Sequence, residues 1–145
     1  MGDFRDKVVE ELKKKFADKV EAFEDNTTDS ILVESGALVE VMKELRDKYE
    51  LPLLLLLTGV DYPEELVAVY QVYSASNANK ITVKVKLPKS KPEVPSLVSV
   101  YPAANVQERE CWDLMGITYK GHPNLTRILT PDDFEGHPLR KDYVG

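Results

Sequence analysis

A strict alternation of apolar and polar residues over residues 80–88 limits the possible folds of this chain more than any other feature. The segment reads KITVKVKLP, so an extended strand would carry Ile81, Val83, Val85 and Leu87 on one side and Thr82, Lys84 and Lys86 on the other. The apolar segment EELVAVYQVYSAS precedes it at 64–76, and the polar tripeptide NAN separates the two. This pattern predicts an antiparallel hairpin with one buried face and one exposed face.

The other apolar segments before residue 88 predict two helices and two further strands. Residues 3–23 and 36–50 carry apolar side chains three or four positions apart, which is typical of amphipathic helices. Residues 29–35, DSILVES, predict a short strand, and LPLLLLLTGV at 51–60 predicts a buried strand. The expected fold class is α+β: about four strands in a mainly antiparallel sheet with two helices on one face, followed by a helix and an extended C-terminal arm.

The character of the sequence changes after residue 88, and we expect three parts. The α+β domain would occupy residues 1–95. Residues 96–116 predict a docking helix that is interrupted or restarted at Pro102 and ends at Gly116. Residues 117–145 show neither a helical nor a strand period, yet they contain large apolar side chains that a disordered tail normally lacks. We interpret this last part as an arm that lies in a groove on a partner protein.

The composition argues against several classes of protein. A chain of 145 residues with a net charge of −6 suits one domain, and an acidic surface disfavours nonspecific binding to nucleic acid or anionic lipid. The single cysteine, Cys111, cannot form an intrachain disulfide and favours a reducing compartment. The longest apolar run, residues 51–60, is about half of a membrane span, and the charged start MGDFRDK is not a signal peptide.

Both histidines lie in a Gly-His-Pro tripeptide, and one hypothesis makes them part of a chemical site. His122 and His137 could bind a metal together with Cys111 and a carboxylate such as Asp132 or Asp133. Their spacing matches no compact metal motif, however. A pair of Cys111 with a histidine could act as a nucleophile, but no oxyanion-binding segment is visible beside it.

Two other hypotheses treat the Gly-His-Pro tripeptides as structural features. Each tripeptide could simply form a turn, because glycine permits unusual backbone angles and proline fixes one. That hypothesis does not explain why Arg127 and Arg140 follow the two tripeptides. Arginine is well suited to bidentate pairing at interfaces, so the repeated pattern favours contact with another protein.

The segment ERECWDLMG, at 108–116, mixes four charges with Trp, Leu and Met. One interpretation is local pairing on a solvent-exposed helix face, for example between Arg109 and Asp113. The neighbouring apolar residues instead suggest a partly buried face, where an ion pair is costly unless its geometry is tight. We therefore favour a specific docking surface.

Residues 108–143, ERECWDLMGITYKGHPNLTRILTPDDFEGHPLRKDY, closely resemble the signature of the 30-kDa subunit of respiratory NADH:quinone oxidoreductase, complex I. The segments TGVDYPEE and VPSLVSVYPAAN also look like upstream landmarks of that family. The family includes the related subunit of membrane-bound nickel-iron hydrogenases and of archaeal ferredoxin-dependent complexes. The resemblance covers roughly residues 30 to 143.

The resemblance implies an α+β domain with an extended C-terminal arm and no cofactor of its own. The partners it implies are a large catalytic subunit, which holds the quinone site or the nickel-iron centre, and iron-sulfur subunits of the peripheral arm. No nucleic acid is expected, and the membrane is contacted only through the complex, on the cytoplasmic side. By match to the motif, the expected subunit-interface residues are Glu108, Arg109, Glu110, Asp113, His122, Arg127, His137, Arg140, Lys141 and Asp142.

Two departures from the family pattern bear on the function. The family usually has two adjacent arginines where this chain has Thr126-Arg127, and the chain ends two residues after its Arg-Lys-Asp-Tyr element. The short C-terminus favours a hydrogenase-type or ferredoxin-dependent complex over NADH:quinone oxidoreductase proper. The predicted function is a non-catalytic scaffold subunit. The rival hypotheses are a stand-alone enzyme that uses Cys111, His122 and His137, and a free adaptor domain.

Overall fold

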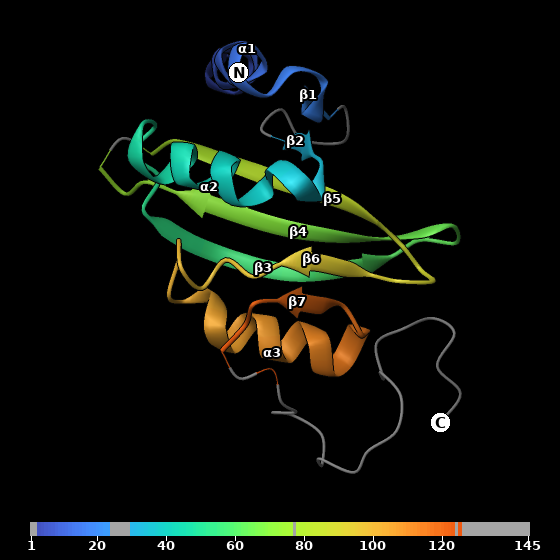
Figure 1. Ribbon diagram of the computed structural model, residues 1–145. Coiled ribbons are helices and arrows are strands. Elements are labelled where there is room, and N and C mark those ends of the chain that lie inside the picture. Colours follow the sequence, from blue (N-terminus) through green and yellow to red (C-terminus); the bar gives the residue numbers. More distant parts are fainter. Residues whose placement is uncertain (1–2, 24–29, 77, 124, 126–145) are drawn as a thin grey trace.

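The computed structural model describes residues 3–23, 30–76, 78–123 and 125 (Figure 1). Its helices are α1 (Asp3–Phe16), α2 (Leu38–Asp47), α3 (Ala104–Met115) and the short 3-10 helices η1 (Ala17–Lys19) and η2 (Ser35–Ala37). Its strands are β1 (Val20–Ala22), β2 (Ser30–Val33), β3 (Leu53–Asp61), β4 (Glu65–Tyr73), β5 (Lys80–Pro88), β6 (Glu93–Pro95) and β7 (Thr118–Lys120).

Five strands form one mixed sheet in the order β1-β2-β5-β4-β3. Strands β3, β4 and β5 form an antiparallel meander, β2 runs parallel to β5, and β1 pairs antiparallel with β2. The short strands β6 and β7 form a separate parallel pair. The predicted α+β class and the hairpin at 64–88 are confirmed, and the described sheet has one strand more than the four expected.

The extra strand comes from the end of the predicted N-terminal helix, and the prediction of helix beyond Phe16 is wrong. Ala17 has a φ of 55°, which a right-handed helix excludes, and the chain then turns into β1. Val20, at the start of β1, is fully buried and pairs with Val33. An apolar residue at this position satisfies both a helical and a strand pattern, so the spacing alone could not show where the helix ends.

The strand predicted at 51–60 exists as β3, but the prediction that it is buried is wrong. Strand β3 lies at the edge of the sheet, where it pairs only with β4 among the described strands. Leu53, Leu55 and Leu56 are 45%, 52% and 39% exposed, whereas Leu57 is buried. A run of leucines has no polar positions to mark an exposed side, so its sequence could not distinguish an edge strand from a central one.

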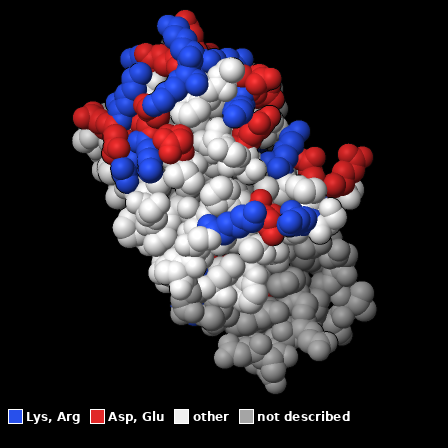
Figure 2. All heavy atoms as spheres, viewed as in Figure 1, with Lys and Arg blue, Asp and Glu red and all other residues white. Residues whose placement is uncertain are grey.

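Helix α2 lies over the sheet, and α1 lies next to β1 and contacts α2 and the residues just after it through side chains (Figure 1). The rings of Phe4 and Tyr49 meet edge to face, with centroids 6.2 Å apart, and the Tyr49 hydroxyl donates a hydrogen bond of 2.6 Å to Glu11. Lys15 of α1 also pairs with Glu44 of α2. Charged side chains gather over these two helices, at the top of the molecule in Figure 2.

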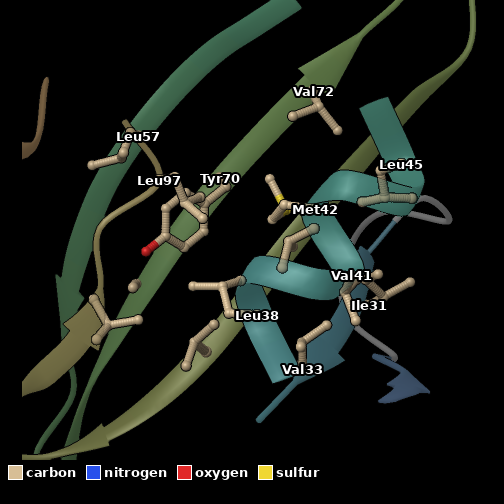
Figure 3. Close-up of a cluster of buried hydrophobic side chains, with 14 of the residues drawn as sticks. Ile31, Val33, Leu38, Val41, Met42, Leu45, Leu57, Tyr70, Val72 and Leu97 are labelled. Atoms are coloured by element: carbon tan, nitrogen blue, oxygen red, sulfur yellow. The ribbon is translucent and has the colours of Figure 1, made fainter. Parts of the chain in front are cut away.

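The main core lies between α2 and one face of the sheet (Figure 3). Helix α2 buries Leu38, Val41, Met42 and Leu45, which follow the three- and four-residue spacing of its sequence. They meet residues such as Ile31 and Tyr70 from the strands. The predicted buried side of β5 is confirmed, because Ile81, Val83, Val85 and Leu87 are all buried, but Thr82, which was expected on the exposed side, is buried as well. Each large aliphatic side chain that is fully buried contributes about 1.5–3 kcal/mol to folding.

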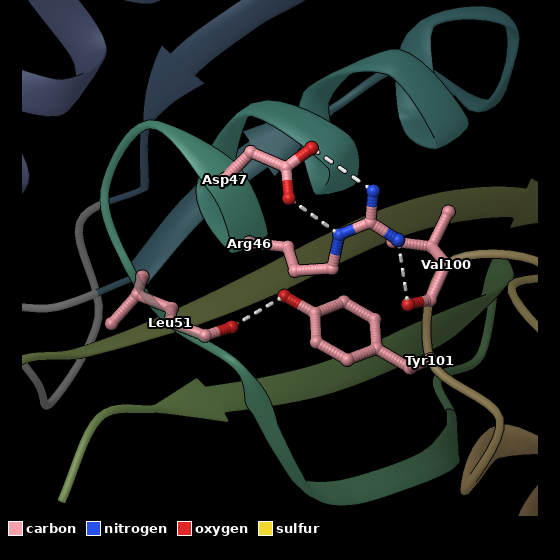
Figure 4. A network of polar contacts seen from close by, with 5 residues as sticks. All are labelled: Arg46, Asp47, Leu51, Val100 and Tyr101. Carbon is pink, nitrogen blue, oxygen red and sulfur yellow. Dashed lines mark hydrogen bonds and ion pairs between the residues drawn. The ribbon is translucent and has the colours of Figure 1, made fainter.

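Residues 96–103 form an irregular segment, and the helix predicted from residue 96 begins only at Ala104. The segment is anchored by side chains rather than by helical hydrogen bonds alone (Figure 4). The Tyr101 hydroxyl donates to the Leu51 carbonyl at 2.7 Å, and the Arg46 guanidinium donates to the Val100 carbonyl at 3.0 Å. These contacts join the segment to the end of α2 and the approach to β3, and they set where α3 starts.

The first residues of the predicted C-terminal arm belong to the folded domain. Strand β7 pairs with β6 through Tyr119 and Val94, and both residues are buried together with Ile117. Leu125 also packs against the hydrophobic core. The rest of the predicted arm, 126–145, lies outside the described residues.

Candidate functional site

Helix α3 carries the charged segment singled out by its sequence, and it packs against β3 at a glycine. A Cβ atom on Gly59 would lie 2.8 Å from Ile117 Cδ1 and 3.3 Å from Cys111 Sγ. The absence of a side chain at Gly59 therefore lets α3 and the residue after its C-terminus approach the strand closely. The helix ends at Gly116, whose φ of 81° is the left-handed conformation common at helix C-termini.

The side chain of Glu108 is fully buried within the domain. Its carboxylate accepts a hydrogen bond of 2.6 Å from the Ser96 hydroxyl and one of 2.7 Å from the Leu97 backbone N–H. Burial raises the pKa of Glu108, while these two hydrogen bonds and the nearby His122 oppose that rise. Glu108 therefore holds the irregular segment 96–103 against α3.

The other three charged residues of the segment lie in different environments. Glu110 is partly exposed and lines a groove of about 230 Å³ between α3 and β3, together with Leu57, Thr58, Gln107, Cys111, Leu114 and Met115. Arg109 is also partly exposed, but Asp113 is fully buried. At about 100° per residue, Asp113 lies roughly 160° around the helix from Cys111, whose side chain faces the strand at Gly59. Its burial contradicts the alternative of a solvent-exposed pairing face.

The first Gly-His-Pro tripeptide forms a turn, as one of the hypotheses predicted. Gly121 has a φ of 86°, and the His122 N–H donates to the Tyr119 carbonyl at 3.2 Å. The His122 ring Nε2 lies 3.0 Å from the Asn105 carbonyl oxygen. Because a carbonyl only accepts, Nε2 carries the proton and donates it. His122 thereby fastens the chain after β7 to the first turn of α3.

Cys111 is poorly suited to nucleophilic chemistry. It is buried on the sheet-facing side of α3, and burial raises the pKa of its thiol to about 11. The reactive form of cysteine is the thiolate, which this environment disfavours at neutral pH. Within residues 3–23, 30–76, 78–123 and 125, no group of three His, Cys, Asp or Glu side chains could hold a metal ion.

The structure therefore brings together only part of the predicted interface set. Glu108, Arg109, Glu110 and Asp113 lie on one helix, with His122 at its N-terminal end. Arg127, His137, Arg140, Lys141 and Asp142 lie outside the described residues, so their roles stay predictions. Sequence reasoning missed Ser96, Asn105 and Gln107, which make the contacts that position α3. The glycine within the β3 pattern was a signal of the close approach of α3.

The described part of the chain is a mixed α+β domain that presents a charged helix at one edge of its sheet, and none of its helices has the length and apolar character needed to cross a membrane. Residues 31–145 match the family model of the respiratory-chain NADH dehydrogenase 30 kDa subunit. The chain belongs to this family. The predicted resemblance is thus confirmed, and with it the assignment to complex I-like electron-transport complexes.

Two curated relatives differ in how much of their length the chain spans. The C subunit of NADH-quinone oxidoreductase from Moorella thermoacetica is 47% identical over 140 residues, which cover 95% of this chain and 94% of the relative. The protein of the same name from Saccharopolyspora erythraea is 46% identical over 77% of this chain, but the match spans only 47% of that relative.

Two solved structures share the fold. A structure titled as the trypsin-resistant fragment (1-134) of Nqo5 has a TM-score of 0.65 and 25% identity, and the match covers 83% of this chain and 98% of that one. A chain in the structure of the membrane-bound sulfane sulfur reductase, an archaeal respiratory membrane complex, has a TM-score of 0.79. It covers 96% of this chain and 85% of the other, and at 24% identity it supports the fold alone.

Proposed function

We propose that this chain is a cofactor-free scaffold subunit in the peripheral arm of a membrane-bound, ion-pumping electron-transfer complex. The observation that carries the proposal is the 47% identity to the C subunit of an NADH-quinone oxidoreductase over nearly the whole of both chains. In this role the chain braces a large catalytic subunit and contacts iron-sulfur subunits. The nickel-iron centre or quinone site and the iron-sulfur clusters belong to those partners.

The geometry of α3 supports a structural rather than a chemical role. Its buried carboxylate, Glu108, is engaged by Ser96 and Leu97 of the same domain, and its cysteine is buried with a raised thiol pKa. These groups hold the helix and the segment before it in place. Glu110 and Arg109 remain partly exposed on the same helix, where a partner could reach them. The stand-alone enzyme is therefore the weaker candidate.

A second candidate within the same class is the C subunit of an NADH:quinone oxidoreductase proper. The sequence favoured a hydrogenase-type or ferredoxin-dependent complex. The Moorella thermoacetica relative weakens that argument, because this chain spans 94% of a protein named for NADH-quinone oxidoreductase. We propose that the chain sits at the cytoplasmic side of the membrane and is held there by its partners.

Purification of the tagged chain from native membranes under mild detergent tests the scaffold proposal. The expected result is stoichiometric recovery of one large subunit and several iron-sulfur subunits, identified by peptide mass spectrometry, with all metal assigned to those partners. Recovery of the chain alone, or stoichiometric metal bound to the isolated chain, would contradict the proposal. Reduction of quinone by NADH, or reduction of protons by reduced ferredoxin, in assays of the recovered complex then distinguishes the two types.

A further inference from the structure

A group of exposed apolar side chains lies where β3 meets the first turn of α3. We define the leucine edge as Leu53, Leu55 and Leu56 of β3 with Val106 of α3. The three leucines are 39–52% exposed and Val106 is 47% exposed. Gln107, next to Val106 in the sequence, accepts a hydrogen bond from the N–H of Leu57, next to Leu56, so the two parts of the edge belong to elements that are in contact. Single exposed apolar residues are ordinary, but a contiguous group marks an interaction surface.

The chain segments that build this part of the surface carry no charged side chains of their own. The segments that build it, 51–60 and 94–107, contain no Lys, Arg, Asp or Glu. In Figure 2 charged side chains are densest over α1 and α2, whereas fewer of them lie on the middle of the molecule. Burial of these two segments would therefore desolvate no charged side chain of their own, which lowers the cost of docking.

One acidic residue stands next to the leucine edge. The groove between α3 and β3 begins at Leu57, directly after Leu56, and Glu110 lines it. Glu110 forms no ion pair with any other residue in the described ranges. An apolar partner segment that carries one Lys or Arg would satisfy both features, since its cation could pair with Glu110 while its apolar side chains cover the leucines.

Two other occupants fit the edge less well. A second copy of this chain would bring two net charges of −6 together, which disfavours self-association. A strand added to β3 would meet Pro52, which has no N–H, and the register shift between Leu54 and Leu56, which leaves Leu55 without a partner position on β4. Side-chain docking is thus favoured over an extension of the sheet.

We infer that the leucine edge is a docking surface for another subunit of the complex, which presents an apolar segment whose one charged residue is a Lys or Arg opposite Glu110. This inference rests on the proposed function, and it identifies a contact separate from the C-terminal arm. Leu55 is the most informative position. It is the most exposed of the leucines and lies at the register shift, so a charge there alters docking while disturbing the fold little.

The test replaces the native chain with tagged variants and measures recovery of the large and iron-sulfur subunits from membranes. Leu55→Glu and Leu55→Lys should each lower recovery at least about tenfold, because either charge would be buried against an apolar surface. Glu110→Lys should lower recovery more than Glu110→Gln. The matched control is Tyr62→Glu, which places the same charge at a side chain that is 45% exposed beyond the other end of β3. Each isolated variant should unfold at the temperature of the wild-type chain.

The possible outcomes separate this inference from the proposed function. Wild-type recovery by both Leu55 variants overturns the inference and leaves the scaffold role intact. Failure of the wild-type chain to recover any partner overturns both. A dimer of the isolated chain that Leu55→Glu dissociates assigns the edge to a second copy instead. Protection of Leu53–Leu56 from hydroxyl-radical labelling in the isolated chain, lost on truncation after Leu125, assigns it to the chain's own C-terminus.

Discussion

The side-chain oxygen of Gln107 accepts a hydrogen bond of 2.9 Å from the backbone N–H of Leu57. This contact places a side chain of α3 where the backbone of a neighbouring strand would otherwise pair with the edge of the sheet. It occurs at the end of the exposed leucines and at the start of the groove that Glu110 lines. Helix α3 thus limits the part of β3 whose backbone could pair with another strand, and it also forms one wall of the groove.

Loss of the acceptor at position 107 should weaken the junction of α3 with β3. Gln107→Ala leaves the Leu57 N–H without its partner and should lower the free energy of unfolding by about 1 kcal/mol. Gln107→Glu keeps an acceptor oxygen and should lower it less. Urea denaturation of the isolated chain measures both. Equal stability of Gln107→Ala and wild type would show that water replaces the side chain at no cost.

A methyl group at Gly59 should disrupt the packing of α3 on the strand. Because the added Cβ would meet Ile117 Cδ1 at 2.8 Å, Gly59→Ala should destabilise the fold by about 1–3 kcal/mol. Ile117→Val removes that atom, so the double variant should be more stable than the sum of the single effects predicts. Gly36→Ala is the control, since nothing lies within 4 Å of a Cβ there. Additive effects of Gly59→Ala and Ile117→Val would contradict the clash.

The hydroxyl of Tyr101 should contribute to the anchoring of residues 96–103. Tyr101→Phe removes its hydrogen bond to the Leu51 carbonyl and leaves that buried acceptor unpaired, at a cost of about 1–3 kcal/mol. The exposed Tyr62 offers a matched control, because Tyr62→Phe removes the same atom at the surface. Thermal unfolding compares the two. A shift of equal size for both variants would rule out a specific role for the Tyr101 hydroxyl.

The buried carboxyl of Glu108 should make stability depend on pH in a definite direction. Its pKa is raised by burial, so the folded chain binds this proton more tightly than the unfolded chain does. The stability it provides is present below the ordinary carboxyl pKa and is lost as pH rises through the raised value. Glu108→Gln does not titrate, so its free energy of unfolding relative to wild type should increase with pH. Urea denaturation from about pH 4 to pH 8 measures that difference; a constant difference would contradict the raised pKa.

Arg140 lies outside the described residues, and its predicted role concerns assembly. Arg140→Glu should reduce recovery of partner subunits from membranes while the melting temperature of the isolated chain stays unchanged. Amides in 126–143 should likewise exchange hydrogen faster in the isolated chain than in the complex. A drop of several degrees in the melting temperature of the variant would instead make Arg140 a residue that the domain itself needs.

Some elements of this fold could be predicted from sequence because their patterns have one interpretation. The alternation in β5 correctly marks its apolar side as buried, and the spacing of α2 matches the side chains that it buries. The leucines of β3 carry no such information, because exposure there depends on the position of the strand in the sheet. Likewise, Val20 could belong to α1 or to a strand until its pairing with Val33 was known.

The candidate site was predictable in part. Its charged helix could be recognised from the segment 108–116, but the environments of Glu108 and Asp113 could not, because burial of a carboxylate depends on tertiary contacts. Ser96 and Leu97 lie twelve and eleven residues before Glu108. Serine is common on protein surfaces, and Leu97 bonds through its backbone N–H, so neither residue type indicates a contact with a buried carboxylate. Gln107 was missed for the same reason, since its partner is a backbone N–H on a distant strand.

The parallel pairing of β2 with β5 has a consequence for how the chain reaches its native state. Strands β3, β4 and β5 are neighbours in sequence and can form as a meander. Strand β2 pairs with β5 although the two are far apart in the sequence, and Ser30 lies opposite Thr82. Because closure of a long loop costs entropy before its contacts form, non-local pairing slows folding. We therefore expect the N-terminal segment to dock late in folding, onto a surface that the meander has already formed.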